Sequence, residues 1–94
     1  MTLETEVQAL RDSVQTAYEA TRFVVTKSVI VGPDRRARML KTMEDTLVKA
    51  ERVFDAILFD RDANKFQMAV AAVEMTLMAW QELQSNCLAD VGLA

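Results

Sequence analysis

Apolar residues recur along the chain at alternating steps of three and four, the spacing of one face of an α-helix rather than of a β-strand. Residues 3–31 keep this spacing without a break. The positions on this first seam are Leu3, Val7, Leu10, Val14, Ala17, Thr21, Val24, Ser28 and Val31. The pattern predicts one long helix over residues 3–31.

Two further segments have the same periodicity. In residues 34–59 the seam positions are Leu40, Met43, Leu47, Ala50, Phe54 and Ile57, and in residues 63–90 they are Phe66, Val70, Val73, Leu77, Trp80 and Cys87. The opposite side of the 34–59 segment is charged, as in an amphipathic surface helix. We expect helices of about these bounds, each roughly 40 Å long at a rise of 1.5 Å per residue.

The residues between these segments are typical of helix junctions. The dipeptide Gly32-Pro33 suits a tight junction, because glycine favours the left-handed residue that ends a helix and proline favours the first turn of the next helix. The second junction is the polar run from Asp60 to Asn64. There we expect Asp60 or Asp62 to cap the third helix by accepting backbone N–H bonds.

The third segment has a second apolar face beside its seam. Between Phe66 and Trp80 only Gln67, Glu74 and Thr76 are polar. The residues of the second face are Met68, Ala71, Ala72, Met75, Met78 and Ala79. A helix that is apolar nearly all round must be covered on more than one side, so we predict that this face is an interaction surface.

The fold class predicted is all-α, with residues 1–94 forming one domain of three long helices in an antiparallel bundle. A chain of 94 residues buries only about two-thirds of its unfolded surface, so association with a further chain adds useful burial. We therefore expect a homodimer in which the third helix is central.

Composition excludes several classes of function. The net charge of −3 argues against general nucleic-acid binding, which needs clustered Lys and Arg to neutralise phosphates. No stretch approaches the ~20 apolar residues that span a bilayer. The first residues, Met1 to Glu6, are acidic where a secretory signal would be basic, and we expect a cytoplasmic location.

Metal and cofactor chemistry has little support in the sequence. The chain has one cysteine, Cys87, and no histidine, so neither an internal disulfide nor a thiolate–imidazole metal site is expected. The run Asp60-x-Asp62-x-Asn64 matches the start of a calcium loop, but Lys65 and Ala71 occupy the positions that need glycine and glutamate. We expect no metal and no cofactor.

One basic cluster stands at the start of the second predicted helix and comprises Arg35, Arg36, Arg38 and Lys41. The dipole of a helix disfavours cations at its N-terminus, so this placement favours a use for the charges. An acidic protein surface or a phosphorylated ligand would suit them. The alternative is a solvated face partly neutralised by Asp34.

Carboxylates are numerous but form no recognisable acid–base pair, and Glu74 alone interrupts an apolar region. The sequence therefore predicts a small helical interaction protein of adaptor, chaperone or inhibitor type, not an enzyme, that binds a larger protein target. The main alternative is a phosphate- or nucleotide-binding helical dimer that uses Arg35, Arg36 and Arg38.

A remote alternative is a small enzyme with the architecture of the all-helical chorismate mutases. Those enzymes have similar length and place arginines from helices around a dianionic ligand. Arg11, Arg22 and Lys27 are the candidates for that role. However, the second helix of that family is short and carries an Arg-Glu pair, whereas this chain has Arg35-Arg36-Ala37 in a long segment.

Overall fold

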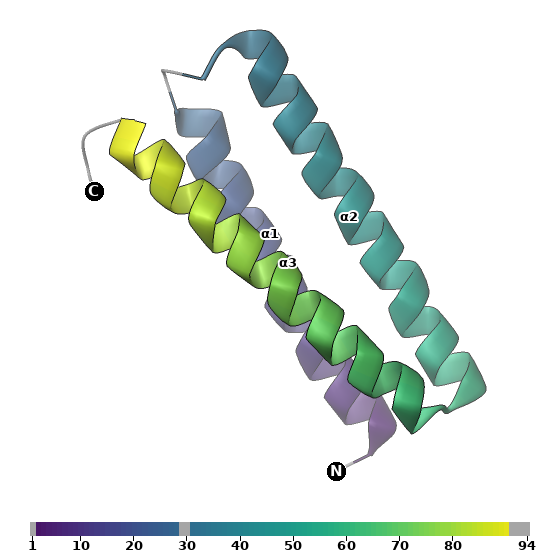
Figure 1. The fold of residues 1–94 in the computed structure, drawn as a ribbon. Coiled ribbons are helices and arrows are strands. Elements are labelled where there is room, and N and C mark those ends of the chain that lie inside the picture. Colours follow the sequence, from purple (N-terminus) through teal and green to yellow (C-terminus); the bar gives the residue numbers. More distant parts are fainter. Residues whose placement is uncertain (1, 29–30, 91–94) are drawn as a thin grey trace.

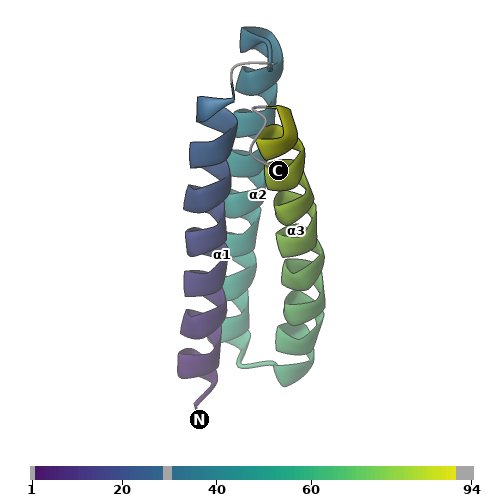
Figure 2. The ribbon, with the colours of Figure 1, turned by 90° about the vertical axis from the view of Figure 1, so that its left-hand side faces the viewer.

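The computed structural model describes residues 2–28 and 31–90, and every element in this part of the chain is helical. The helices are α1 (Leu3–Lys27), α2 (Pro33–Asp60) and α3 (Ala63–Asp90). They lie side by side in a narrow body of 44 × 24 × 16 Å (Figures 1 and 2). The α1–α2 junction and the end of α3 lie at one end of this body, and the α2–α3 turn lies at the other (Figure 1). The expectation of an all-helical fold with three packed helices is confirmed.

The first helix ends earlier than predicted. α1 stops at Lys27, whereas the seam predicted a helix to residue 31. Ser28 is extended, with φ −69° and ψ 119°, and its N–H bonds to the carbonyls of Val24 and Val25. The residues that follow in the sequence are β-branched and precede Gly32-Pro33, a combination that disfavours helix. Val31 is still buried, but as part of a bend rather than a helix.

Gly32 also differs from the prediction. Its backbone is extended, with φ −62° and ψ 154°, and it serves as the N-cap of α2 rather than as a left-handed end to α1. The cause is Pro33, the first residue of α2, because the residue before a proline is pushed toward extended conformations. The left-handed residue of the chain described is Arg61, with φ 50°, which ends α2.

At the second junction Asp62 caps α3, as expected. Its Oδ1 accepts the backbone N–H groups of Asn64 at 2.9 Å and Lys65 at 3.4 Å. The Asp60 carboxylate accepts a hydrogen bond from Lys65 Nζ, which raises the pKa of that ammonium group. The carboxylates that resemble a calcium loop therefore hold the helix start and a lysine in place.

The core follows the predicted seams closely. The buried side chains are Val7, Val14, Thr21, Val25, Ser28 and Val31 from the first third of the chain, Met43, Phe54 and Ile57 from α2, and Ala69, Val73, Trp80 and Cys87 from α3. Two buried residues lie beside the predicted seams rather than on them. Val25 is fully buried while the predicted Val24 is half-buried, and Ala69 is buried while the predicted Val70 is half-buried.

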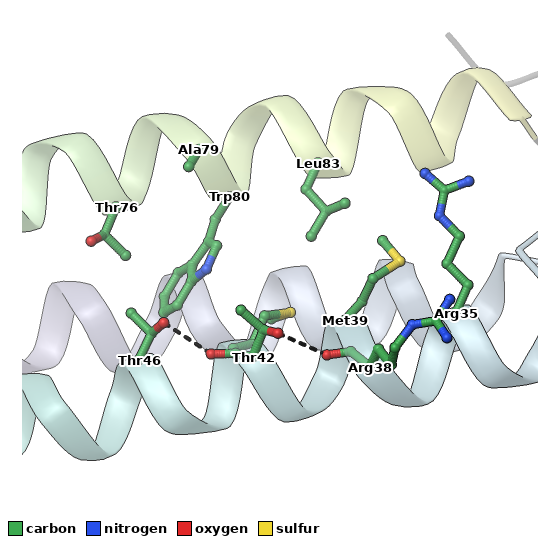
Figure 3. A pocket seen from close by; sticks show the side chains of 10 residues that line it. Arg35, Arg38, Met39, Thr42, Thr46, Thr76, Ala79, Trp80 and Leu83 are labelled. Carbon is green, nitrogen blue, oxygen red and sulfur yellow. Dashed lines mark hydrogen bonds between the residues drawn. The ribbon is translucent and has the colours of Figure 1, made fainter.

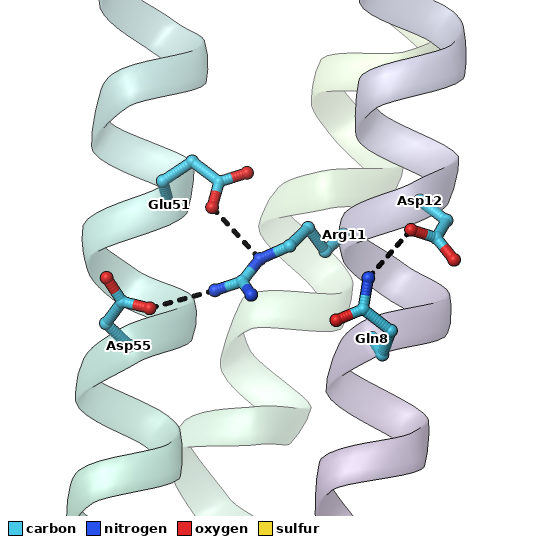
Figure 4. Close-up of polar contacts among 5 residues, drawn as sticks. All are labelled: Gln8, Arg11, Asp12, Glu51 and Asp55. Carbon is cyan, nitrogen blue, oxygen red and sulfur yellow. Dashed lines mark hydrogen bonds and ion pairs between the residues drawn. The ribbon is translucent and has the colours of Figure 1, made fainter.

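Polar contacts tie α1 to both other helices. Arg11 reaches from α1 to α2, where its Nε lies 2.9 Å from Glu51 Oε2 and its Nη2 donates to Asp55 Oδ1 at 2.9 Å (Figure 4). On the other side, Gln84 Nε2 of α3 donates to the buried Oγ1 of Thr21 at 2.8 Å. By contrast, α2 and α3 contact each other least of the three pairs.

Candidate interaction surface

The second apolar face of α3 is exposed along its whole length. We call it the methionine face, and it consists of the six predicted residues Met68, Ala71, Ala72, Met75, Met78 and Ala79. Met68, Met75 and Met78 are 74%, 72% and 68% exposed. These three long apolar side chains lie exposed on one side of one helix. Exposed apolar patches of this kind commonly mark interaction sites.

A groove runs beside this face between α2 and α3. Its larger part, about 620 Å³, is lined by Arg35, Arg38, Met39, Thr42, Met43 and Thr46 of α2 and by Thr76, Ala79, Trp80 and Leu83 of α3 (Figure 3). A smaller part of about 190 Å³ continues it toward the α2–α3 turn, over Ala50, Phe54, Ala69 and Val73. Thr46 and Thr76 line both parts, so we treat them as one α2–α3 groove.

The threonines of the groove use their hydroxyls within their own helices. Thr42 Oγ1 donates to the Arg38 carbonyl, Thr46 Oγ1 to the Thr42 carbonyl and Thr76 Oγ1 to the Ala72 carbonyl, at 2.9 to 3.0 Å (Figure 3). Such i−4 bonds are common for threonine in helices. Because these hydroxyls are bonded within the helices, the threonines add little polarity to the groove, and its lining is mainly apolar.

Trp80 is the largest side chain of the groove lining. Its side chain extends from α3 toward Thr42 and Thr46 of α2 (Figure 3), and its ring lies 6.1 Å from that of Tyr18 on α1. The neighbouring Ala79, a much smaller side chain, also lines the groove. Trp80 is therefore both a core residue, as predicted, and part of the groove lining.

The four residues of the basic cluster lie in three different environments. Arg36 is half-buried, and its Nη2 donates to the carbonyls of Ser28 and Val31, so it holds the end of α1. Arg35 and Arg38 line the end of the groove, and no ion pair among the described residues involves either of them. Lys41 is directed to solvent, 4.0 Å from Asp45. Only Arg35 and Arg38 thus belong to a common site.

The remaining chemical candidates lie apart. Arg11 forms ion pairs with Glu51 and Asp55. Arg22 and Phe23 line a shallow depression on α1. The Lys27 ammonium group lies 5.8 Å from the centroid of the Phe23 ring. Cys87 is buried, as expected. Glu74 is exposed. Within residues 2–28 and 31–90, no group of three cysteine or carboxylate side chains is placed to hold a metal ion.

Sequence reasoning found the methionine face but missed the groove. The residues missed are Met39, Thr42, Thr46, Thr76 and Leu83. One signal was available, since Ala69, Ala72, Thr76 and Ala79 recur at steps of three and four beside the α3 seam. A line of small side chains next to a core seam indicates either close helix packing or an open groove, and the sequence does not distinguish the two.

No family model, curated protein or solved structure matches this chain. In the part of the chain that the structure describes, no helix has the length and hydropathy needed to cross a membrane.

The division of the basic cluster predicts unequal effects on stability. Arg36→Ala removes the donor to the carbonyls of Ser28 and Val31 at the α1–α2 junction, and we expect it to lower the free energy of unfolding by about 1–3 kcal/mol. Lys41→Ala, in the same helix, changes it by less than about 0.5 kcal/mol, because its ion pair is exposed. Urea unfolding followed by circular dichroism at one protein concentration measures both. Equal losses in the two variants would contradict this role for Arg36.

Proposed function

We propose that this protein is a small helical interaction protein, of adaptor, chaperone or inhibitor type, that binds a larger protein target through the methionine face of α3. The observation that carries the proposal is the exposure of Met68, Met75 and Met78 beside an apolar groove. Burial of this surface by a partner contributes roughly 25 cal/mol for each Å² of apolar area removed from water.

The chemistry of the surface suits protein binding better than catalysis. Methionine side chains are flexible and polarisable, so they adapt to varied partner surfaces. The groove offers apolar side chains and threonine methyls rather than groups that transfer protons or attack a substrate. We therefore propose that the protein binds its target in the cytoplasm and needs no cofactor or metal. We also propose that its three helices form an antiparallel bundle that is completed by homodimerisation through α3.

Substitution on the methionine face tests the proposal. Met75→Glu places a charge at the middle of the surface, and we expect it to reduce retention of the target by at least about tenfold, as for a residue at the centre of an interface. The wild-type chain and the variant are immobilised, exposed to lysate, and the retained proteins are quantified by mass spectrometry.

Phe23→Glu is the matched control. Phe23 is an exposed apolar side chain on α1, 63% exposed, and lies outside the proposed surface. It should leave retention unchanged. Circular dichroism confirms that both variants fold. If Met75→Glu retains the same proteins in the same amounts as the wild type, the methionine face is not the binding surface.

Arg35 and Arg38 favour a second candidate, an anion-binding dimer. Two arginines at the groove end, with no ion pair among the described residues, suit a phosphate group. This candidate predicts that inorganic phosphate or ATP raises the melting temperature by mass action, and that Arg35→Ala/Arg38→Ala abolishes the rise. The interaction protein predicts no rise beyond that given by sodium chloride at equal ionic strength.

A further inference from the structure

The methionine face and the α2–α3 groove lie next to each other on one side of the molecule. Ala72 and Ala79 belong to both, since each is part of the face and each lines the groove. Met75 follows Ala72 by three residues and precedes Ala79 by four, so it stands directly beside them on the helix surface. An apolar ridge therefore borders an apolar groove.

We propose that the α2–α3 groove receives α3 of a second copy of this chain, so that the methionine ridge of each copy lies in the groove of the other. The inference rests on the homodimerisation through α3 proposed above and names the groove as its receptor, so the second copy and the larger target compete for the methionine face. A two-fold dimer brings the same patch of both subunits together, which requires a self-complementary surface. A ridge that borders a groove meets this requirement.

Charge favours the same occupant. The α2 side of the groove carries Arg35, Arg38 and Lys49. From Phe66 to its end at Asp90, α3 contains acidic residues, among them Glu74 and Glu82, and no Lys or Arg. An α3 helix seated in the groove therefore places carboxylates along a basic wall. Complementary potentials of this kind steer association and select against basic partners.

The shape of the groove also suits a helix rich in methionine. Ala69, Ala72 and Ala79 form its low wall on α3, while Trp80 and Phe54 lie at its base. Small residues at an interface let helix backbones approach closely, and flexible methionines fill the irregular space that remains. The threonine hydroxyls are already hydrogen-bonded, so docking leaves no groove hydroxyl without a partner.

The solution mass of the full chain, measured by light scattering over a range of concentrations, tests the inference. We expect the wild type to reach twice its 10.6 kDa chain mass. Met75→Glu on the ridge and Thr46→Glu in the groove should each raise the dimer dissociation constant at least about tenfold, because each places a carboxylate inside the interface. Thr26 is an exposed threonine of α1, so Thr26→Glu is the matched control and should leave the constant unchanged.

The variants separate this inference from the proposed function. If Met75→Glu dissociates the dimer but Thr46→Glu does not, α3 self-associates outside the groove, which overturns the inference and leaves the proposed function intact. A wild type that stays monomeric overturns both the inference and the proposed homodimerisation through α3, while the lysate experiment tests the binding of a larger target separately. Circular dichroism shows that each variant is folded.

A second test exchanges the charges of the groove wall and of α3, and it does not require knowledge of how far the two α3 helices are shifted along each other. Arg35→Glu/Arg38→Glu makes the groove wall acidic, and Glu74→Lys/Glu82→Lys makes α3 basic. Each double variant alone should be monomeric where the wild type is a dimer, because like charges then face each other. An equimolar mixture should form a heterodimer, since each α3 then meets a groove of opposite charge. A mixture that stays monomeric contradicts the charge pairing.

Discussion

α1 contacts both other helices, and this arrangement leaves α2 and α3 with the least contact of the three pairs. The buried seam of α1 runs from Val7 to Val25, with Arg11 engaging α2 on one side and Thr21 engaging α3 on the other. A helix in this position can cover only one side of each neighbour. Because α3 is apolar on two sides, its second side stays open.

The open side of α3 borders the α2–α3 groove. The indole ring of Trp80 packs near Tyr18 of α1 and extends toward α2, and alanine and threonine side chains line the groove beside it. The threonine hydroxyls bond to carbonyls of their own helices, which leaves an apolar surface with arginines at one end. The partner that we propose is apolar, as this groove and the exposed methionine ridge are, and its acidic flanks match the arginines.

The sequence was sufficient for the fold because helix periodicity is a local property. The seams identified most of the buried residues, although Val25 and Ala69 are buried where the seams had Val24 and Val70. Asp60 or Asp62 was correctly expected to cap α3. The errors were at positions where backbone conformation depends on neighbours, namely the end of α1 at Lys27 and the extended Gly32 before Pro33.

The candidate surface was only partly predictable. The apolar character of Met68, Met75 and Met78 is visible in the sequence, and so is the charge of Arg35 and Arg38. The groove was not predictable, because it depends on how far apart two helices lie, and helix periodicity does not give that distance. The same holds for Arg36, whose role depends on the carbonyls of Ser28 and Val31 at the α1–α2 junction.

In the proposed dimer, the methionine ridge and the α2–α3 groove are two halves of one interface. Methyl NMR of methionine-labelled protein on dilution tests it most directly, because Met68 and Met75 lie on the ridge while Met39 and Met43 line the groove. We predict that the ridge and groove methyl signals shift together over one concentration range. Ridge signals that shift while Met39 and Met43 stay unchanged would contradict the claim, as would a spectrum that does not depend on concentration.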